Sequence, residues 1–501
     1  MSKTIADSGK IARYFPDKEG ERAADWLAKN VPLFECPDSR FEEVYYHRWH
    51  TYAKHLKHTA EGFIVTEFLP DVSWAGKHNS INAAAGHHFY EGRWLRHAEQ
   101  YLDDYAVFWY RKGGSLRSYS SWLADAILAY ATVIGDMTLL LELLPDMAQN
   151  YAAWEQSNRH ESGLFWSCDD RDAMEFSISG SGLRPTLNSY MYADAKAISE
   201  LARLADDSPL SSEFQEKTER LKKLVQRRLW DEEDGFFKCV PLDSVKADAV
   251  WRFDRVDPAR NVREELGFIP WYFSLPDKGY ECAWRQLVSE EGFLAPYGPT
   301  TAERRHPRFQ FAHQNHECLW NGPSWPFATS QTLTAMANLL DEYEQDAVTK
   351  TQYFETLERY VQCHYRTESD GTRVFWIDEN IDPFTGRWLS RDILESWGGR
   401  ADKGGYERGR DYNHSTFCDL IITGLVGLRP RNDDTLELRP LLPEGCWNYF
   451  LLEDVSYRRH SLTILYDRTG EHYKRGKGLL IYIDGVLAKK SDGLYGTETR
   501  L

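Results

Sequence analysis

Pairs of amphipathic helices recur along most of the chain. In residues 189–206 and again in 212–230, apolar residues repeat at intervals of three or four, which places them on one face of a helix. At least four such helical hairpins are predicted between residues 90 and 428, the last of them ending in a helix over 412–427. No strict sequence repeat accompanies the hairpins, so a short-period solenoid is not expected. Hairpins arranged in a ring form an α/α barrel, whose long loops surround one concave end.

The C-terminal part of the sequence has a different pattern. Short β-like runs alternate with turn residues, and the last run ends at Asp484-Gly485, a dipeptide typical of a hairpin turn. We therefore expect three segments. Residues 1–60 would pack on the barrel, residues 61–428 would form the barrel, and residues 429–501 would form a small antiparallel β module with a structural role.

Composition excludes several classes of function. A net charge of −17 argues against binding to nucleic acid, which needs a basic surface. The sequence contains no apolar run of about 18 residues, so no membrane span is predicted. The N-terminal MSKTIADSGK has no apolar core of a secretory signal, so a cytoplasmic location is expected. The sequence leaves the oligomeric state open.

Motifs for metals and common cofactors are missing from the sequence. The eight cysteines form no CxxC pair, which argues against a zinc site and a disulfide framework. His47 and His50 share a spacing of three, and His87 neighbours His88, but no third ligand follows at a characteristic distance. GxSxG, P-loop and strand-linked GxGxxG motifs are also missing, so neither a metal nor a cofactor is expected.

Four acidic residues crowd into one short stretch. Asp169, Asp170, Asp172 and Glu175 lie within seven positions of the segment 163–176. Crowded carboxylates repel one another, so one of them can stay protonated near neutral pH and act as a general acid. The alternative is an ordinary solvated acidic turn.

A second acidic stretch follows two aromatic residues. In residues 375–387, Asp378, Glu379 and Asp382 precede a turn that contains proline. A carboxylate here could act as a general base on water. An ordinary acidic turn is again the alternative.

The segment HECLWNGPSWPF, residues 316–327, combines flat apolar faces with hydrogen-bonding groups. Trp320 and Trp325 offer the faces, while His316, Glu317 and Asn321 offer polar contacts. Sugars present both kinds of surface, so this mixture favours a carbohydrate ligand. A structural loop that plugs the barrel end is the alternative.

Two weaker stretches have the same mixture of polar and aromatic residues. One is residues 67–82, with Trp74 and Lys77. The other is residues 262–273, with Arg263 and Glu264.

Several of these pieces resemble glycoside hydrolase family 63, which includes mannosylglycerate hydrolases and processing α-glucosidases. NGPSWPF (321–327) resembles the family's RGPVW stretch, and ENIDPFTG (379–386) resembles its EYYDPxTG segment. LNSYMYADAKAISELARLADD (187–207) is similar to the helix after its general-acid loop, and DYNHSTFCDLI (411–421) stands where the family has FSWTAAL. The resemblance implies an (α/α)6 six-hairpin barrel, the fold shared with trehalases.

The resemblance also implies catalytic roles. The family's general acid is an aspartate in a WDNSPRF-like loop, which falls on Asp172, with Asp170 as a close competitor. Its general base falls on Glu379, with Glu407 in reserve. The expected sugar-binding residues are Trp74, Lys77, Arg184, Arg263, Glu264, His316, Glu317, Trp320, Asn321, Trp325 and His414.

The sequence thus predicts an inverting glycosidase that acts on a small carbohydrate, with an α-linked glucoside or mannoside as the first expectation. Rhamnosides and arabinosides are alternatives on the same barrel. Two rivals belong to other classes. A sugar epimerase or isomerase would favour paired histidines at the centre, and a non-catalytic carbohydrate-binding protein would not need four acids in one loop.

Overall fold

Six helical segments that are far apart in the sequence form an inner ring. The computed structural model describes residues 5, 8–15, 18–242, 253–310 and 316–501. Each inner segment contacts the next one along the chain. They are α3 (Ala85–Gly92), α5 (Leu123–Ile134), α7 (Pro185–Leu204), α9 (Ile269–Tyr272), α10 (Pro326–Glu342) and the π-helical η10 (Leu420–Leu425).

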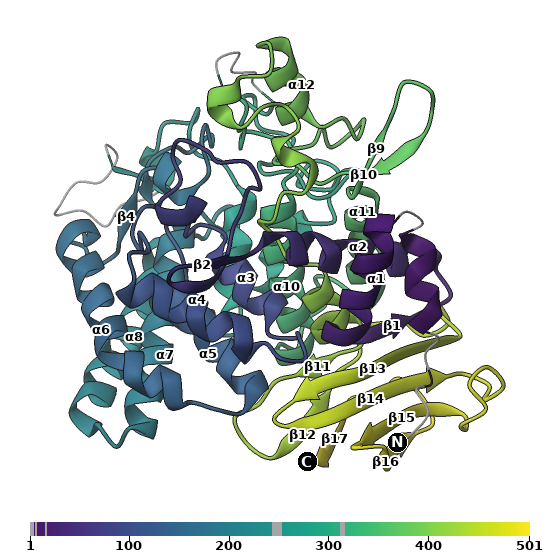
Figure 1. The fold of residues 1–501 in the computed structure, drawn as a ribbon. Helices are drawn as coiled ribbons and strands as arrows, with labels where there is room; N and C mark the ends of the chain where they lie inside the picture. The colour runs from purple at the N-terminus through teal and green to yellow at the C-terminus, as the bar shows by residue number, and fades with distance from the viewer. Residues whose placement is uncertain (1–4, 6–7, 16–17, 243–252, 311–315) are drawn as a thin grey trace.

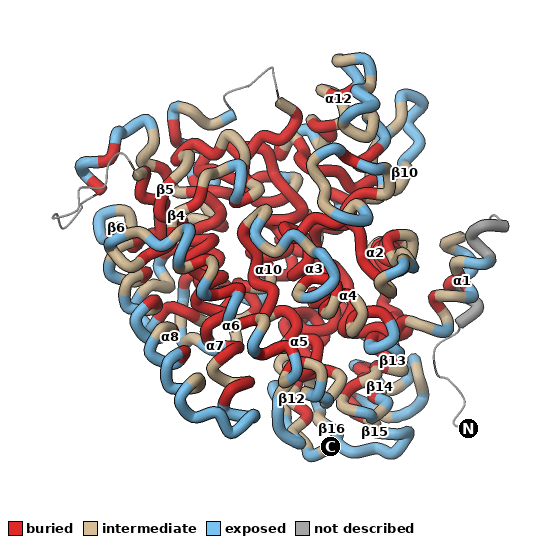
Figure 2. The backbone as a smooth tube through the Cα atoms, turned by 60° about the vertical axis from the view of Figure 1, so that its left-hand side comes forward, coloured by how far each residue is buried: buried red, intermediate tan, exposed pale blue. Residues whose placement is uncertain are grey.

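An outer segment precedes each inner one, so the chain forms six helical hairpins within the described residues. The outer segments are α2 (Ser39–His55), α4 (Glu99–Arg111), α6 (Thr138–Asn158), α8 (Ser208–Arg228), η7 (Glu281–Gln286) and α11 (Lys350–Gln362). The inner segments are buried along most of their length, whereas the outer helices expose one face to solvent (Figure 2). This pattern follows from a closed ring, in which only the outer layer can keep a polar face. The predicted (α/α)6 barrel is confirmed.

Buried charges close the ring between its first and last inner segments. The Glu91 carboxylate, in α3, accepts hydrogen bonds of 2.9–3.2 Å from the backbone N–H groups of Phe417, Cys418 and Asp419. The Arg93 guanidinium donates to Asp419 Oδ1 at 2.8 Å. These contacts provide acceptors for N–H groups at the start of the last helix, which have no partners within it.

The last inner helix is shorter than the sequence predicts. Helix was expected over 412–427, but residues 412–417 have neither helical nor strand structure, and the helix begins at Cys418. The Tyr412 N–H donates to the Ile377 carbonyl at 3.2 Å, and the Asn413 N–H donates to the Glu67 carbonyl at 3.0 Å. Pairing with distant segments thus replaces the local hydrogen bonds of a helix.

The predicted C-terminal strands form an antiparallel sheet. β13 (Tyr449–Tyr457), β14 (His460–Asp467), β15 (Gly478–Ile483) and β16 (Val486–Ser491) pair in sequence order. Between β15 and β16, Asp484 and Gly485 both have positive φ, 51° and 79°, as a type I′ turn requires. β11 (Leu428–Arg429), β12 (Thr435–Leu438) and β17 (Thr497–Arg500) form a second small sheet.

The N-terminal segment extends this sheet. β1 (Leu33–Glu35) pairs with the edge of β13, so the first and last parts of the chain share one sheet. Helix α1 (Lys18–Asn30) precedes β1. The division of the chain into three segments, with boundaries at residues 60 and 428, remains a proposal. In this proposal both terminal segments pack together on the barrel.

The sheet and the long loops lie at opposite ends of the barrel (Figure 1). The Arg458 N–H, in the turn after β13, donates to the Val133 carbonyl near the C-terminal end of α5 at 2.7 Å. The loops at the other end carry helix α12 (Leu389–Ser396) and short strand pairs. These strands are β2 (Leu56–Thr59), β3 (Gly62–Val65), β4 (Trp166–Ser167), β5 (Gly182–Leu183), β8 (Val240–Pro241), β9 (Tyr365–Thr367) and β10 (Arg373–Phe375).

Within the described residues, no helix combines the length and the hydropathy that crossing a bilayer requires.

Replacing Glu91 with alanine tests the closure of the ring. The change leaves buried N–H groups without an acceptor, and each such group costs about 1–3 kcal/mol. We expect the free energy of unfolding to fall by roughly 3 kcal/mol, as measured by urea denaturation. Glu99→Ala, on the exposed face of α4, is the matched control and should change stability by less than about 0.5 kcal/mol. Equal stability of the two variants would contradict this role of Glu91.

Candidate active site

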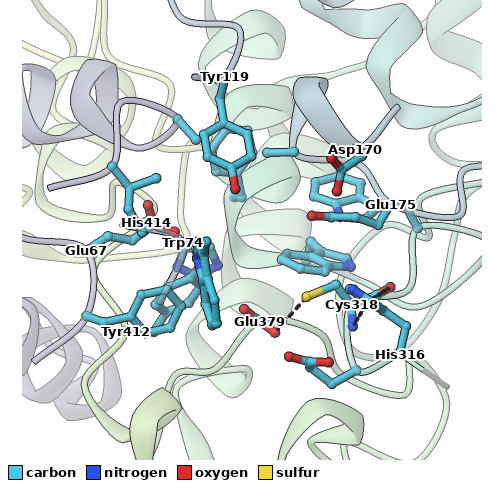
Figure 3. Close-up of a pocket in the computed structure, with 18 of the residues that line it drawn as sticks. Glu67, Trp74, Tyr119, Asp170, Glu175, His316, Cys318, Glu379, Tyr412 and His414 are labelled. Carbon is cyan, nitrogen blue, oxygen red and sulfur yellow. Dashed lines mark hydrogen bonds between the residues drawn. The ribbon is translucent and has the colours of Figure 1, made fainter. Parts of the chain in front are cut away.

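A cavity of about 210 Å³ opens at the loop end of the barrel (Figure 3). Most of its lining residues lie in the five connections that lead from an outer segment into the next inner helix, so the ring brings five distant loops together. Its carboxyl groups belong to Glu67, Asp170, Glu175, Glu317 and Glu379. Its aromatic walls are Phe68, Trp74, Tyr119, Trp320, Trp325, Phe327 and Tyr412, together with His316 and His414.

The segment 316–327 forms a rigid aromatic wall. The rings of Trp320 and Trp325 stack with centroids 4.4 Å apart, and Trp325 Nε1–H donates to the Leu319 carbonyl at 2.8 Å. Gly322 has φ of 151°, and a Cβ at this position would lie 2.8 Å from the backbone nitrogen of Gln310. Glycine therefore permits the close approach of two backbones that holds this wall in place.

Glu379 is buried and held by two donors. Arg408 donates to its Oε2 at 2.8 Å, and the Cys318 thiol donates to the same oxygen at 3.1 Å. Burial raises the pKa of Glu379, and Arg408 opposes this rise, so that the pKa is about 6. Glu379 is therefore mostly ionised at neutral pH and can accept a proton.

Glu317 lies next to Glu379 and shares the same cation. Lys403 Nζ donates to its two oxygens at 2.5 and 2.7 Å, and the Arg408 guanidinium lies 3.0 Å from it. Burial acts to raise the pKa of Glu317, but Arg408 and Lys403 outweigh it and lower the pKa below its usual range. Glu317 is thus a fixed negative charge in the cavity floor.

Glu175 has the opposite electrostatic setting. It follows η3 (Asp170–Asp172), and its backbone carbonyl accepts from the Trp320 N–H at 3.1 Å. Among the described residues its carboxylate forms no ion pair, and burial raises its pKa well above the usual range. The surroundings of Glu175 therefore favour its protonated form, which can donate a proton.

Glu67 was not expected at the site. It is buried, lines the cavity and accepts a hydrogen bond from the Tyr412 hydroxyl. Burial raises its pKa to about 8. The sequence marked residues 67–82 as a weak candidate stretch but gave no motif that singles out Glu67 within it.

The structure does not place all predicted catalytic carboxyls in the cavity. Asp170 reaches its rim, whereas Asp172 is fully buried against the Arg184 guanidinium at 2.7 Å and does not line the cavity. Ala173, with φ of 57°, reverses the chain between Asp172 and Glu175. Glu407 is exposed at the protein surface and pairs with Arg391 at 3.0 Å. These positions argue against Asp172 and Glu407 as the acid and the base, because neither reaches a sugar in the cavity.

The predicted sugar-binding residues divide into two groups. Trp74, His316, Glu317, Trp320, Trp325 and His414 line the cavity, whereas Lys77, Arg184, Arg263, Glu264 and Asn321 are not among its lining residues. Several of the second group have partners elsewhere. Lys77 pairs with Glu61 at 2.5 Å, Arg263 pairs with Glu303 at 2.7 Å, and the Glu264 carboxylate accepts from Ser179. Their polar groups stabilise the loops around the cavity.

Three consecutive residues offer atoms that could bind a metal ion. The donor atoms of His316, Glu317 and Cys318 lie within 4.8 Å of one another. Lys403 and Arg408 already neutralise Glu317, however, and burial raises the pKa of the Cys318 thiol well above its usual range. A metal ion would have to displace these cations and the thiol proton.

Comparison with known proteins identifies the family. A model described as the mannosylglycerate hydrolase MGH1-like glycoside hydrolase domain matches residues 77–415. A solved structure named sialidase is 41% identical over 99% of this chain, with a TM-score of 0.88, and the match spans 45% of that longer chain.

Two further solved structures are more distant. The GH78 family rhamnosidase of Bacillus sp. GL1 has 12% identity and a TM-score of 0.55, with 90% of this chain and 41% of that chain covered. The GH63 mannosylglycerate hydrolase from Thermus thermophilus, in complex with glucose, has 14% identity and a TM-score of 0.48, with 70% of this chain and 99% of that chain covered. The likeness to the rhamnosidase concerns the fold alone. On the match over residues 77–415, the chain belongs to the mannosylglycerate hydrolase MGH1-like glycoside hydrolase family.

Proposed function

We propose that this protein hydrolyses the glycosidic bond of a small neutral glycoside with inversion of configuration. The observation that carries the proposal is that Glu175 and Glu379 line one aromatic cavity. Glu379 has a cation beside it and Glu175 has none among the described residues, so their surroundings favour opposite protonation states. A neutral acid and an ionised base are the two groups that this hydrolysis needs. Membership of the family supports the same reaction.

The two carboxyls take distinct roles in the proposed mechanism. Glu175 protonates the oxygen of the leaving group, and Glu379 removes a proton from the water that attacks the anomeric carbon from the opposite face. An inverting arrangement needs about 6.5–9.5 Å between the carboxyls, so that water fits between base and sugar. Glu175 replaces Asp172 as the proposed acid, because Asp172 is paired with Arg184 outside the cavity.

The cavity favours one sugar ring with no charge. Its volume of about 210 Å³ lies below the roughly 300–1,000 Å³ of typical sites for drug-sized ligands. Two of the carboxyls that line it, those of Glu317 and Glu379, are negatively charged at neutral pH, and its lysine, Lys403, is already paired with Glu317. A sialic acid, which the name of the 41% identical relative suggests, carries a carboxylate that this lining would repel.

Among neutral substrates, α-linked glucosides and mannosides remain the first candidates, with rhamnosides and arabinosides as alternatives. Trp320 and Trp325 would stack on the apolar face of the ring, and His316 and His414 would contact its hydroxyls. Hydrolysis, rather than epimerisation or binding alone, is favoured by two carboxyls in one cavity whose surroundings favour opposite protonation states.

Glu175→Gln and Glu379→Gln should each lower kcat by about 10²-fold to 10⁴-fold, which is the usual contribution of general acid–base catalysis. A 2,4-dinitrophenyl glycoside should largely rescue Glu175→Gln, since its leaving group needs no proton, but it should not rescue Glu379→Gln. Glu407→Gln is the control and should keep full activity. A Glu175→Gln enzyme with undiminished turnover of an unactivated glycoside would refute the assignment.

The proposed substrate class and stereochemistry can be tested with a panel of p-nitrophenyl glycosides. We expect cleavage of a neutral glucoside, mannoside, rhamnoside or arabinoside, and none of an N-acetylneuraminide. NMR spectra taken early in the reaction should show the anomer opposite to that of the substrate. Retention of configuration, or preference for the sialoside, would contradict the proposal.

The pH dependence should report the pKa of Glu379. Glu379 must be ionised to act as a base, so kcat/KM should fall about tenfold per pH unit below about pH 6. Arg408 lowers the pKa of Glu379, so Arg408→Gln should shift this limb of the pH profile to higher pH. Arg410 lies in the same short helix, η9 (Arg408–Arg410), but is exposed, so Arg410→Gln should leave the pH profile unchanged. A limb that does not move in Arg408→Gln would exclude Glu379 as the titrating group.

A further inference from the structure

The proposed reaction uses two of the five carboxyls that line the cavity, and Glu67 is one of the three that it leaves unused. Glu67 follows β3 and lines the cavity together with Phe68 and Trp74. In Figure 3, Glu67 and Glu175 lie on opposite sides of the cavity. Glu67, Phe68 and Trp74 all precede residue 77, where the match to the family model begins. This wall is therefore contributed by a part of the chain that the family model does not describe.

Hydrogen bonds to both the backbone and the side chain fix the position of Glu67. The Asn413 N–H donates to its backbone carbonyl at 3.0 Å, and the Tyr412 hydroxyl donates to Oε1. The Tyr412 ring stacks on Phe68 and on His414, with centroids 4.4 and 3.7 Å apart. The carboxyl group is thus preorganised before any ligand binds.

The second carboxyl oxygen of Glu67 is buried and has no hydrogen-bond partner among the described residues. Burying a polar atom without a partner is unfavourable, so such an atom at a cavity wall points to a ligand that supplies the partner. Because burial raises the pKa of Glu67 to about 8, the group is mostly a neutral carboxylic acid at neutral pH. It can then both donate and accept hydrogen bonds.

We propose that Glu67 is a specificity-determining residue that binds one hydroxyl of the sugar ring through Oε2. The inference rests on the proposed function and adds to it the group that selects the sugar. Glu67 takes no part in proton transfer to the leaving group or from water. A site that pairs a buried polar group with a substrate hydroxyl rejects the analogue without that hydroxyl, because the group is then left unpaired.

The experiment compares one substrate with its monodeoxy analogues. The substrate is the p-nitrophenyl glycoside that the wild-type protein cleaves fastest, and each analogue lacks one ring hydroxyl. We expect the wild-type kcat/KM to favour the parent over one of these analogues by at least about tenfold. Glu67→Leu should abolish the preference at that hydroxyl alone, because it removes the hydrogen bond but keeps an apolar side chain of similar length.

Two further variants make the comparison decisive. Glu67→Asp keeps the acid but withdraws it by one methylene, so it should weaken the same preference. Glu61→Gln, in the same hairpin but paired with Lys77 at the surface, should match the wild type. Thermal unfolding of each variant identifies any loss of fold.

The proposal is overturned if folded Glu67→Leu and Glu67→Asp keep the wild-type preference at every hydroxyl. It is also overturned if they lose activity equally on the parent and on all analogues, since a purely structural role predicts this result. A wild-type protein that cleaves no glycoside of the panel instead refutes the proposed function, and this inference with it. That outcome is distinct from an active enzyme whose selectivity does not change.

Discussion

The architecture depends on closing a ring of helices whose first and last members are more than 300 residues apart in the chain. Glu91 and Arg93 on one side, and residues 417–419 on the other, close it through buried, charge-assisted hydrogen bonds. Such bonds are short and strongly directional, so they fix the position of the last helix as well as its stability. Once the ring is closed, the loops before the inner helices converge at one end.

This convergence lets one protein hold several carboxyls in different charge states within a small volume. Arg408 bridges Glu317 and Glu379, and Lys403 adds a second cation to Glu317 alone. Glu175 and Glu67 have no such ion pair among the described residues, so burial dominates their pKa values. The protonation pattern therefore follows from where the two cations lie.

The turn that carries Arg408 needs an unusually close approach. A Cβ on Gly409 would lie 2.0 Å from the Asp378 carboxyl, so the backbone of this turn packs directly on the residue before Glu379. Asp378 Oδ1 in turn accepts the Glu379 N–H at 2.8 Å. Arg408 and Glu379 are thus positioned through one compact unit that combines backbone packing with an ion pair.

The sequence by itself determined the features that depend on local pattern. Helical periodicity indicated the hairpins, and the Asp484-Gly485 turn indicated a β-hairpin, because these signals need only neighbouring residues. The combination of tryptophans and polar groups in 316–327 indicated the cavity wall for the same reason. The resemblance on segments 321–327 and 379–386 pointed to the family to which the chain belongs.

Only the tertiary structure decided which acidic residues face the cavity. Asp172 and Glu175 are three positions apart, yet Arg184 holds the first outside the cavity and the turn at Ala173 directs the second into it. Glu67 and Tyr412 meet across 345 positions, a contact that no local pattern encodes. Residues 412–417 are not helical, and the N–H groups of Tyr412 and Asn413 instead donate to the distant carbonyls of Ile377 and Glu67. Side-chain charge and orientation at the site depend on such long-range partners, which become neighbours only when the barrel closes.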